Sequence, residues 1–151
     1  WNAHVAPNLD AYMGLVFEAM VEEAYFRLQS THQLPLVREW GRWEGLDRNR
    51  QPLEIDVASV LMDKRVLTGA LKWSRQKVDV NVHTRHLAML DRLAEGGVGW
   101  AREARKPSSP LLYVASDGFT DRFLQAATAA RDEVYLWTLR DLYTAVPGQG
   151  G

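Results

Sequence analysis

The chain has 151 residues, of which 46% are hydrophobic and 25% are charged, values typical of one globular domain. Its formal net charge of −1 provides no overall attraction to nucleic acid, so any such binding requires a local basic surface. Because the chain has no cysteine, it forms neither disulfides nor thiolate metal sites. No apolar run approaches the roughly 18 residues needed to span a membrane, so we expect a soluble, cytoplasmic protein without a membrane partner.

The chain opens at Trp1 with neither an initiator Met nor the basic and apolar regions of a signal peptide. We therefore expect a single domain over residues 1–151 that was excised from a larger protein. The Gly-rich residues 145–151 are predicted to be a flexible tail.

The spacing of apolar residues predicts the elements in chain order. A 3.6-residue period predicts a helix over residues 9–28, and a polar break after it ends at Pro35. Three strand-like runs follow at residues 36–43, 53–61 and 65–73, and the short turn Asp63-Lys64 predicts an antiparallel hairpin between the last two. The remaining elements are a helix at 82–93, a strand at 111–115, a helix at 119–131, a strand at 134–139 and a short helix at 140–143. Without the short last helix the order is α-β-β-β-α-β-α-β, which predicts an α/β fold with a mixed sheet flanked by helices.

The second and third strand-like runs carry the residues with chemical potential. Side chains alternate along a strand, so Glu54 and Asp56 share one face, and Ala70 and Lys72 share another. If these strands pair, a carboxylate and a lysine converge beside the sheet. Carboxylates hold Mg²⁺ and a lysine steadies developing negative charge, as metal-assisted phosphodiester hydrolysis requires. On spacing alone, a solvated strand face is the more common explanation of this pattern.

Four segments of the chain resemble a known family, in the same order along the sequence. These are VAPNLDAYMG at residues 5–14, GRW at 41–43, EIDVA at 54–58 and GALKWS at 69–74. They resemble the C-terminal domain of a family of archaeal and bacterial ATPases, a domain that is similar to PD-(D/E)XK nucleases. The resemblance covers nearly the whole chain and implies a restriction-endonuclease-like fold. It also implies the ATPase domain of a parent chain and nucleic acid, most naturally DNA, as partners.

The resemblance implies a role for three residues of this sequence. It implies that Asp56 is the central metal ligand and that Glu18 on the first helix is a second acidic ligand. It also implies that Lys72 and Asp56 are the catalytic residues, and that the site uses Mg²⁺ or Mn²⁺. Glu54 is a further candidate metal ligand because it shares a strand face with Asp56.

The sequence departs from the family at Ala70-Leu71, where the family has Glu-Cys before Lys-Trp. A methyl group cannot bind a metal, and loss of a carboxylate ligand weakens Mg²⁺ binding and misplaces the attacking water. Three explanations stay open: a natural pseudo-enzyme, an acid that has migrated to Glu54 or Glu18, or an engineered change. Because Leu71 departs as well, we favour drift to a weak or inactive site.

Several other residues have both a functional and a structural interpretation. Arg75 and Lys77, directly after the third strand, are candidates to bind phosphates, or they belong to an ordinary solvated turn. Trp73 is a candidate to stack on bases, or it packs in the core. His83 and His86 lie three apart on a predicted helix as metal ligands or, more commonly, as packing residues.

Together these observations predict an accessory nuclease-like domain of an ATPase, associated with nucleic acid and carrying a degenerate phosphodiesterase site. Whether it cleaves is left open by the sequence. The rival hypothesis is a non-enzymatic module that docks on the ATPase domain or on another partner, for which an exposed apolar patch is the expected sign.

Overall fold

The computed structural model describes residues 2–144, and within them the side chains of residues 13–143. The tail predicted at residues 145–151 lies outside the described residues. Within the described range, no helix is both long and apolar enough to cross a membrane.

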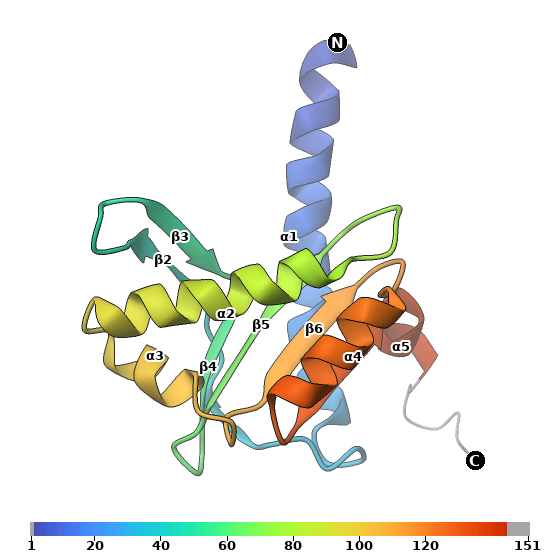
Figure 1. The fold of residues 1–151 in the computed structure, drawn as a ribbon. Helices are drawn as coiled ribbons and strands as arrows, with labels where there is room; N and C mark the ends of the chain where they lie inside the picture. Colours follow the sequence, from blue (N-terminus) through green and yellow to red (C-terminus); the bar gives the residue numbers. More distant parts are fainter. Residues whose placement is uncertain (1, 145–151) are drawn as a thin grey trace.

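A five-stranded mixed sheet forms the centre of the fold, in the order β1-β4-β5-β6-β7 (Figure 1). The antiparallel part joins β1, β4 and β5, and the parallel part joins β5, β6 and β7. A separate two-stranded sheet pairs β2 with β3. The strands are β1 (Val37–Glu39), β2 (Trp43–Leu46), β3 (Pro52–Ile55), β4 (Val57–Leu61), β5 (Val66–Lys72), β6 (Leu111–Ala115) and β7 (Val134–Thr138).

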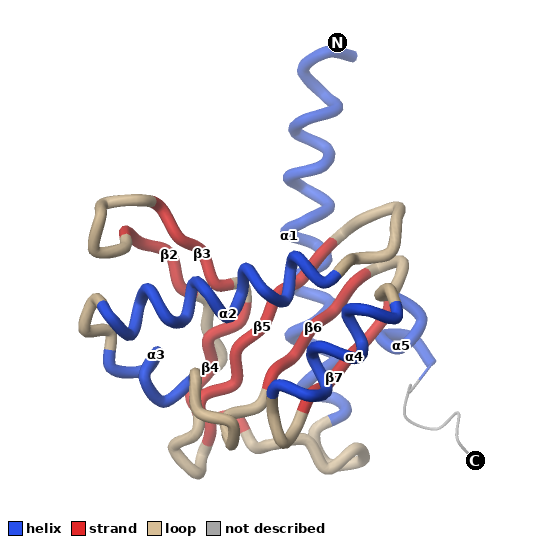
Figure 2. The backbone as a smooth tube through the Cα atoms, in the orientation of Figure 1, coloured by secondary structure: helices blue, strands red, loops and turns tan. Residues whose placement is uncertain are grey.

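Helices cover both faces of the five-stranded sheet (Figures 1 and 2). One face carries α2, α3 and α4, and the other carries α1 and α5. The N-terminal part of α1 extends beyond the sheet, as the backbone trace in Figure 2 shows. The helices are α1 (Asn2–Leu28), α2 (Val80–Glu95), α3 (Gly99–Ala104), α4 (Asp121–Ala130) and α5 (Leu139–Thr144).

Apolar side chains alternate between the two faces of the sheet and so build a core on each side. On the α1 face, Phe17 and Val21 of α1 pack with Leu67 and Leu112 of the sheet. On the other face, α2 and α3 pack around Leu90 and its neighbours, while α4 packs against β6 through a further buried cluster. The mixed α/β sheet flanked by helices is therefore confirmed, including the antiparallel hairpin of β4 and β5.

The predicted order of elements was wrong at two strands and at one helix. The run at residues 36–43 is not one strand, because β1 pairs with β4 whereas β2 begins only at Trp43 and pairs with β3. The run at residues 53–61 divides at Asp56 into β3 and β4, which belong to different sheets. The segment after α2 contains α3, a helix that the prediction lacked, held in place by the buried Ala101 and Ala104. The first helix also begins earlier than predicted, at Asn2.

Candidate metal centre

Asp56 occupies the point where the chain leaves one sheet for the other. It lies between the last residue of β3 and the first of β4, and Val57 is the first residue paired with β5. Its Oδ2 accepts a hydrogen bond of 2.9 Å from the backbone N–H of Leu71 in β5. The side chain thus takes a place that a backbone carbonyl would occupy in a continuous ladder. One carboxylate oxygen is therefore fixed by the sheet, and the carboxylate is held just before β4, beside the C-terminal end of β5.

Three carboxylates converge around this point. Glu18 of α1, Glu54 of β3 and Asp56 each offer an oxygen, and these oxygens all lie within 4.8 Å of one another. Among the described side chains, this is the one group of three or more acidic, histidine or cysteine residues with that closeness. Oxygen donors at this spacing suit a hard cation such as Mg²⁺ or Mn²⁺. The structure therefore brings together all three acids predicted from the sequence, although their role as ligands is still a prediction.

The predicted reason for this convergence was wrong in part. Alternation along one strand placed Glu54 and Asp56 on the same face, but Asp56 is not in a strand. The two residues approach because the chain turns out of β3 between them, and the Leu71 N–H holds the Asp56 carboxylate at the turn.

Arg42 inserts a positive charge into the acidic group. Its guanidinium pairs with Glu54, lies 3.5 Å from Glu44 and lies 4.0 Å from Glu18. Partial burial raises the pKa of Glu18, and the nearby Asp56 and Glu54 charges raise it further, while Arg42 acts in the opposite direction. The cluster therefore carries an internal cation that compensates part of its charge. This role of Arg42 was not predicted from the sequence, because it depends on the pairing of β2 with β3.

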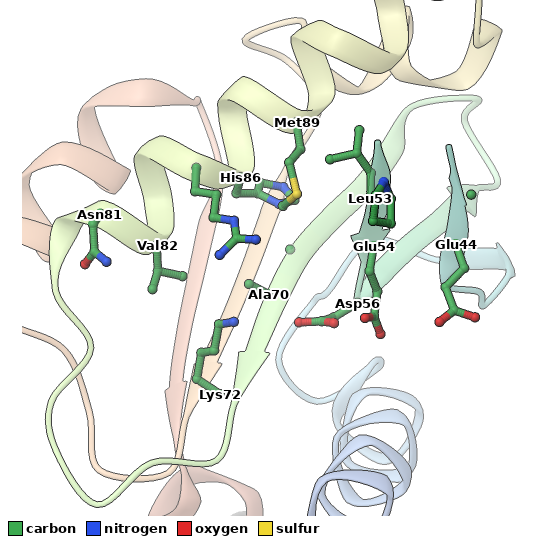
Figure 3. A pocket seen from close by; sticks show the side chains of 14 residues that line it. Glu44, Leu53, Glu54, Asp56, Ala70, Lys72, Asn81, Val82, His86 and Met89 are labelled. Carbon is green, nitrogen blue, oxygen red and sulfur yellow. The ribbon is translucent and has the colours of Figure 1, made fainter. Parts of the chain in front are cut away.

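A cavity of about 420 Å³ opens beside the acidic group, between the β2–β3 sheet, β5 and α2. Asp56 and Lys72 both line it, and Figure 3 shows their side chains pointing toward the same space with Ala70 close by. A second hollow of about 370 Å³ lies on the α1 side of Asp56 and contains Glu18 and Arg42. Asp56 is therefore shared by both hollows, and Lys72 faces the first. The full lining of the first comprises Glu44, Gly45, Pro52, Leu53, Glu54, Asp56, Gly69, Ala70, Lys72, Asn81, Val82, Arg85, His86 and Met89.

Ala70 forms part of the cavity wall two residues before Lys72. Its side chain is almost fully buried, with 8% of the residue exposed. Since a methyl group offers no lone pair, β5 contributes no carboxylate to the site. The acids come instead from α1, β3 and the junction at Asp56, which is the arrangement that the migrated-acid explanation requires.

The remaining predicted residues lie apart from the carboxylates. Arg75 and Lys77 are exposed in the loop between β5 and α2 and line neither of the two hollows that contain Asp56. Trp73 is 42% exposed, and its ring meets that of Phe17 edge-on with the centroids 5.4 Å apart. Trp73 therefore packs on α1 while part of its surface stays accessible.

His83 and His86 follow the structural interpretation. Both are buried on α2, where His83 Nδ1 lies 2.7 Å from the Tyr113 hydroxyl and His86 Nε2 lies 3.0 Å from the Thr68 hydroxyl. Each histidine thus joins α2 to the sheet through a buried hydrogen bond, and the described residues place no third metal-binding side chain beside them.

The fold and the site define an α/β domain with an acidic group where β4 begins and β5 ends in a mixed sheet. The chain belongs to the family DUF234, Archaea bacterial proteins of unknown function, whose model matches residues 1–83. The matched range contains the three carboxylates together with Arg42 and Lys72. Searches of the curated proteins and of the solved structures each returned no match.

Proposed function

We propose that this chain is a nuclease-like domain of the PD-(D/E)XK type, associated with nucleic acid, whose metal-dependent phosphodiesterase site has been weakened. The observation that carries the proposal is the convergence of three carboxylate oxygens within 4.8 Å of one another, beside a cavity that Asp56 shares with Lys72. The resemblance to the C-terminal domain of ATPases adds the expectation that the domain works next to an ATPase domain in a longer chain.

The donor set supports Mg²⁺ or Mn²⁺ as the cation. All three candidate ligands offer carboxylate oxygens, and within the described residues the group contains neither histidine nor a thiolate. Asp56, Glu18 and Glu54 would hold the ion. When bound, such an ion lowers the pKa of a water molecule and neutralises charge on a phosphate.

The residues of the chain supply the other requirements of phosphodiester hydrolysis. The hydrogen bond from Leu71 N–H fixes Asp56, so little rearrangement is needed when the carboxylate acts. Lys72 lines the same cavity, and its ammonium group is suited to neutralise negative charge that develops on a phosphate oxygen.

Two features weaken the site. Ala70 stands where the family pattern has a carboxylate on β5. The positive charge of Arg42 also neutralises part of the negative charge of the acids. A cation that binds here must compete with the guanidinium and has fewer ligands. We therefore propose slow cleavage, with weak affinity for the metal as its cause.

A cleavage assay with Mn²⁺ and a supercoiled plasmid tests this proposal. The expected result is slow nicking by the native chain, an increase of at least about tenfold in Ala70→Glu, and its loss in Ala70→Glu combined with Lys72→Met. Ala70→Gln is the matched control, since it adds the same volume without the charge and should give no increase. If neither the native chain nor a correctly folded Ala70→Glu variant binds Mn²⁺ or cleaves DNA, the proposal fails.

A second candidate function rests on a different surface. An apolar hollow of about 620 Å³ lies between α1 and α5, and its lining includes Val16, Met20, Leu142 and Tyr143. Tyr143 is 58% exposed there, and apolar surface of this kind is typical of protein–protein contacts. The rival proposal is a module that docks on the ATPase domain of its parent chain. Val16→Asp should then weaken co-purification with the separately expressed ATPase domain and leave Mn²⁺ binding unchanged.

A further inference from the structure

Two cations line the cavity without acidic partners. Lys72 extends from the end of β5, and Arg85 extends from the second turn of α2. Within the described part of the chain, neither side chain lies within 4.0 Å of a carboxylate, although eight other contacts of this kind occur. Both residues are exposed, so their charges are available to a ligand from solution.

The charges of the cavity are divided between its two sides. The acids Glu44, Glu54 and Asp56 come from the β2–β3 sheet and its end, whereas the cations come from β5 and α2. Figure 3 shows this division, with Lys72 and Asn81 on the side opposite the acids. Arg42 pairs with Glu44 and Glu54 from outside the cavity, whereas Lys72 and Arg85 form no ion pair with any described residue. An anion that enters the cavity is therefore favoured on the β5–α2 side and repelled on the side of the acids.

The start of α2 adds to this attraction. Asn81 and Val82, in the first turn of the helix, line the same cavity. The Asn81 amide is therefore a further hydrogen-bond donor beside Lys72 and Arg85, whereas the Asp79 carboxylate already caps the backbone N–H of Val80 at the start of the helix. A guanidinium donates two parallel hydrogen bonds to phosphate oxygens, which an isolated ammonium group does not.

We infer that Arg85 and Lys72 form a phosphate subsite that binds the phosphodiester backbone of nucleic acid directly, without requiring the metal. Arg85 is a positioning residue in this subsite, since it holds a phosphate beside the carboxylates. The inference rests on the nucleic-acid association in the proposed function, but it is independent of whether the acids hold a metal. It assigns the phosphodiester to the β5–α2 side of the cavity and leaves the acids to the other side.

Fluorescence anisotropy with a labelled 20-base-pair DNA duplex, in EDTA, tests the inference on the full chain. Arg85→Gln should weaken binding about tenfold, the loss expected for a hydrogen bond to a charged group. It should also reduce the slope of log K against log salt by about 0.9, the value for one phosphate contact. Arg85→Lys should show the native slope but only part of the native affinity, because lysine keeps the charge and cannot donate the two parallel hydrogen bonds of a guanidinium.

Arg140→Gln is the matched control, because Arg140 is an exposed arginine on α5 at the other face of the sheet. Equal weakening by both variants, or an unchanged affinity in Arg85→Gln, overturns the inference. Phosphorus NMR with inorganic phosphate shows whether the subsite binds free phosphate or the phosphodiester of nucleic acid. If Arg85→Gln no longer binds inorganic phosphate but binds DNA as tightly as the native chain, the subsite exists but its assignment to nucleic acid is wrong. Because no metal is present, these outcomes do not depend on Mn²⁺ binding, whose absence would refute the proposed catalytic site separately.

Discussion

Removal of the Arg42 charge should tighten the binding of a divalent cation. The guanidinium now pairs with Glu54 and lies 3.5 Å from Glu44 and 4.0 Å from Glu18, so it occupies part of the electrostatic field that a metal would use. In Arg42→Gln the acids keep their positions on α1, β2 and β3 while the competing charge is gone. The variant should therefore hold Mn²⁺ more tightly, although it has lost three contacts.

The size of the effect follows from the exposure of the pairs. The Arg42 side chain is 40% exposed and those of Glu18 and Glu54 are 30% and 49% exposed, so solvent screens each pair. Exposed pairs contribute about 0.2 to 1 kcal/mol each, and their sum is about 1 kcal/mol when screening is included. A difference of 1.4 kcal/mol is a factor of about ten in affinity, so we expect Mn²⁺ binding to tighten about fivefold.

Titration calorimetry with Mn²⁺ at pH 7 and low salt measures this change. Arg38→Gln provides the matched control, because Arg38 is an exposed arginine on β1 that lines none of the described cavities. Unchanged or weaker Mn²⁺ binding in Arg42→Gln, with the fold intact by circular dichroism, would refute the idea that the guanidinium competes with the metal.

Three further predictions concern stability. Gly69→Ala should destabilise the fold by more than about 3 kcal/mol in urea unfolding, because a Cβ there would overlap the Leu112 carbonyl oxygen; a loss below 1 kcal/mol would contradict the close approach of β5 and β6. Tyr25→Phe should cost about 1 to 2 kcal/mol, since the buried hydroxyl donates a 2.6 Å hydrogen bond to the Pro35 carbonyl, and an unchanged melting temperature would refute this. Burial lowers the pKa of His86 from 6.5 to about 3. As the pH falls, His86 is therefore protonated in the unfolded chain before it is protonated in the folded chain. The contribution of His86 to the unfolding free energy should therefore fall as pH drops below about 6.5, by at most about 1.4 kcal/mol per pH unit, and His86→Gln should remove that contribution.

The local pattern of apolar residues predicted the core strands well, because a buried strand is marked within its own few residues. Residues 65–73 and 111–115 were predicted as strands and correspond closely to β5 and β6, whose side chains are buried nearly throughout. The division of the chain at Asp56 could not be predicted in this way. It depends on a hydrogen bond from Leu71, fifteen residues further along, which replaces a bond of the ladder.

The acids of the candidate site were within reach of the sequence, whereas their electrostatic setting was not. Glu54 and Asp56 are close in the chain, and the family resemblance singled out Glu18 on a distant helix. The contact of Arg42 with Glu54 arises only when β2 pairs with β3, in the register Trp43 with Ile55. That pairing was hidden because residues 36–43 have the composition of one continuous strand.

Titration of the native chain and of Asp56→Asn with Mn²⁺ tests whether the three carboxylates hold a metal ion. Asp56 is the acid that the sheet holds in place, and asparagine keeps the size of the side chain while removing its charge. We expect weak, saturable binding of one Mn²⁺ by the native chain and none by the variant. Equal binding by both proteins, or no saturable binding by the native chain, would contradict the assignment of the three carboxylates as a metal centre.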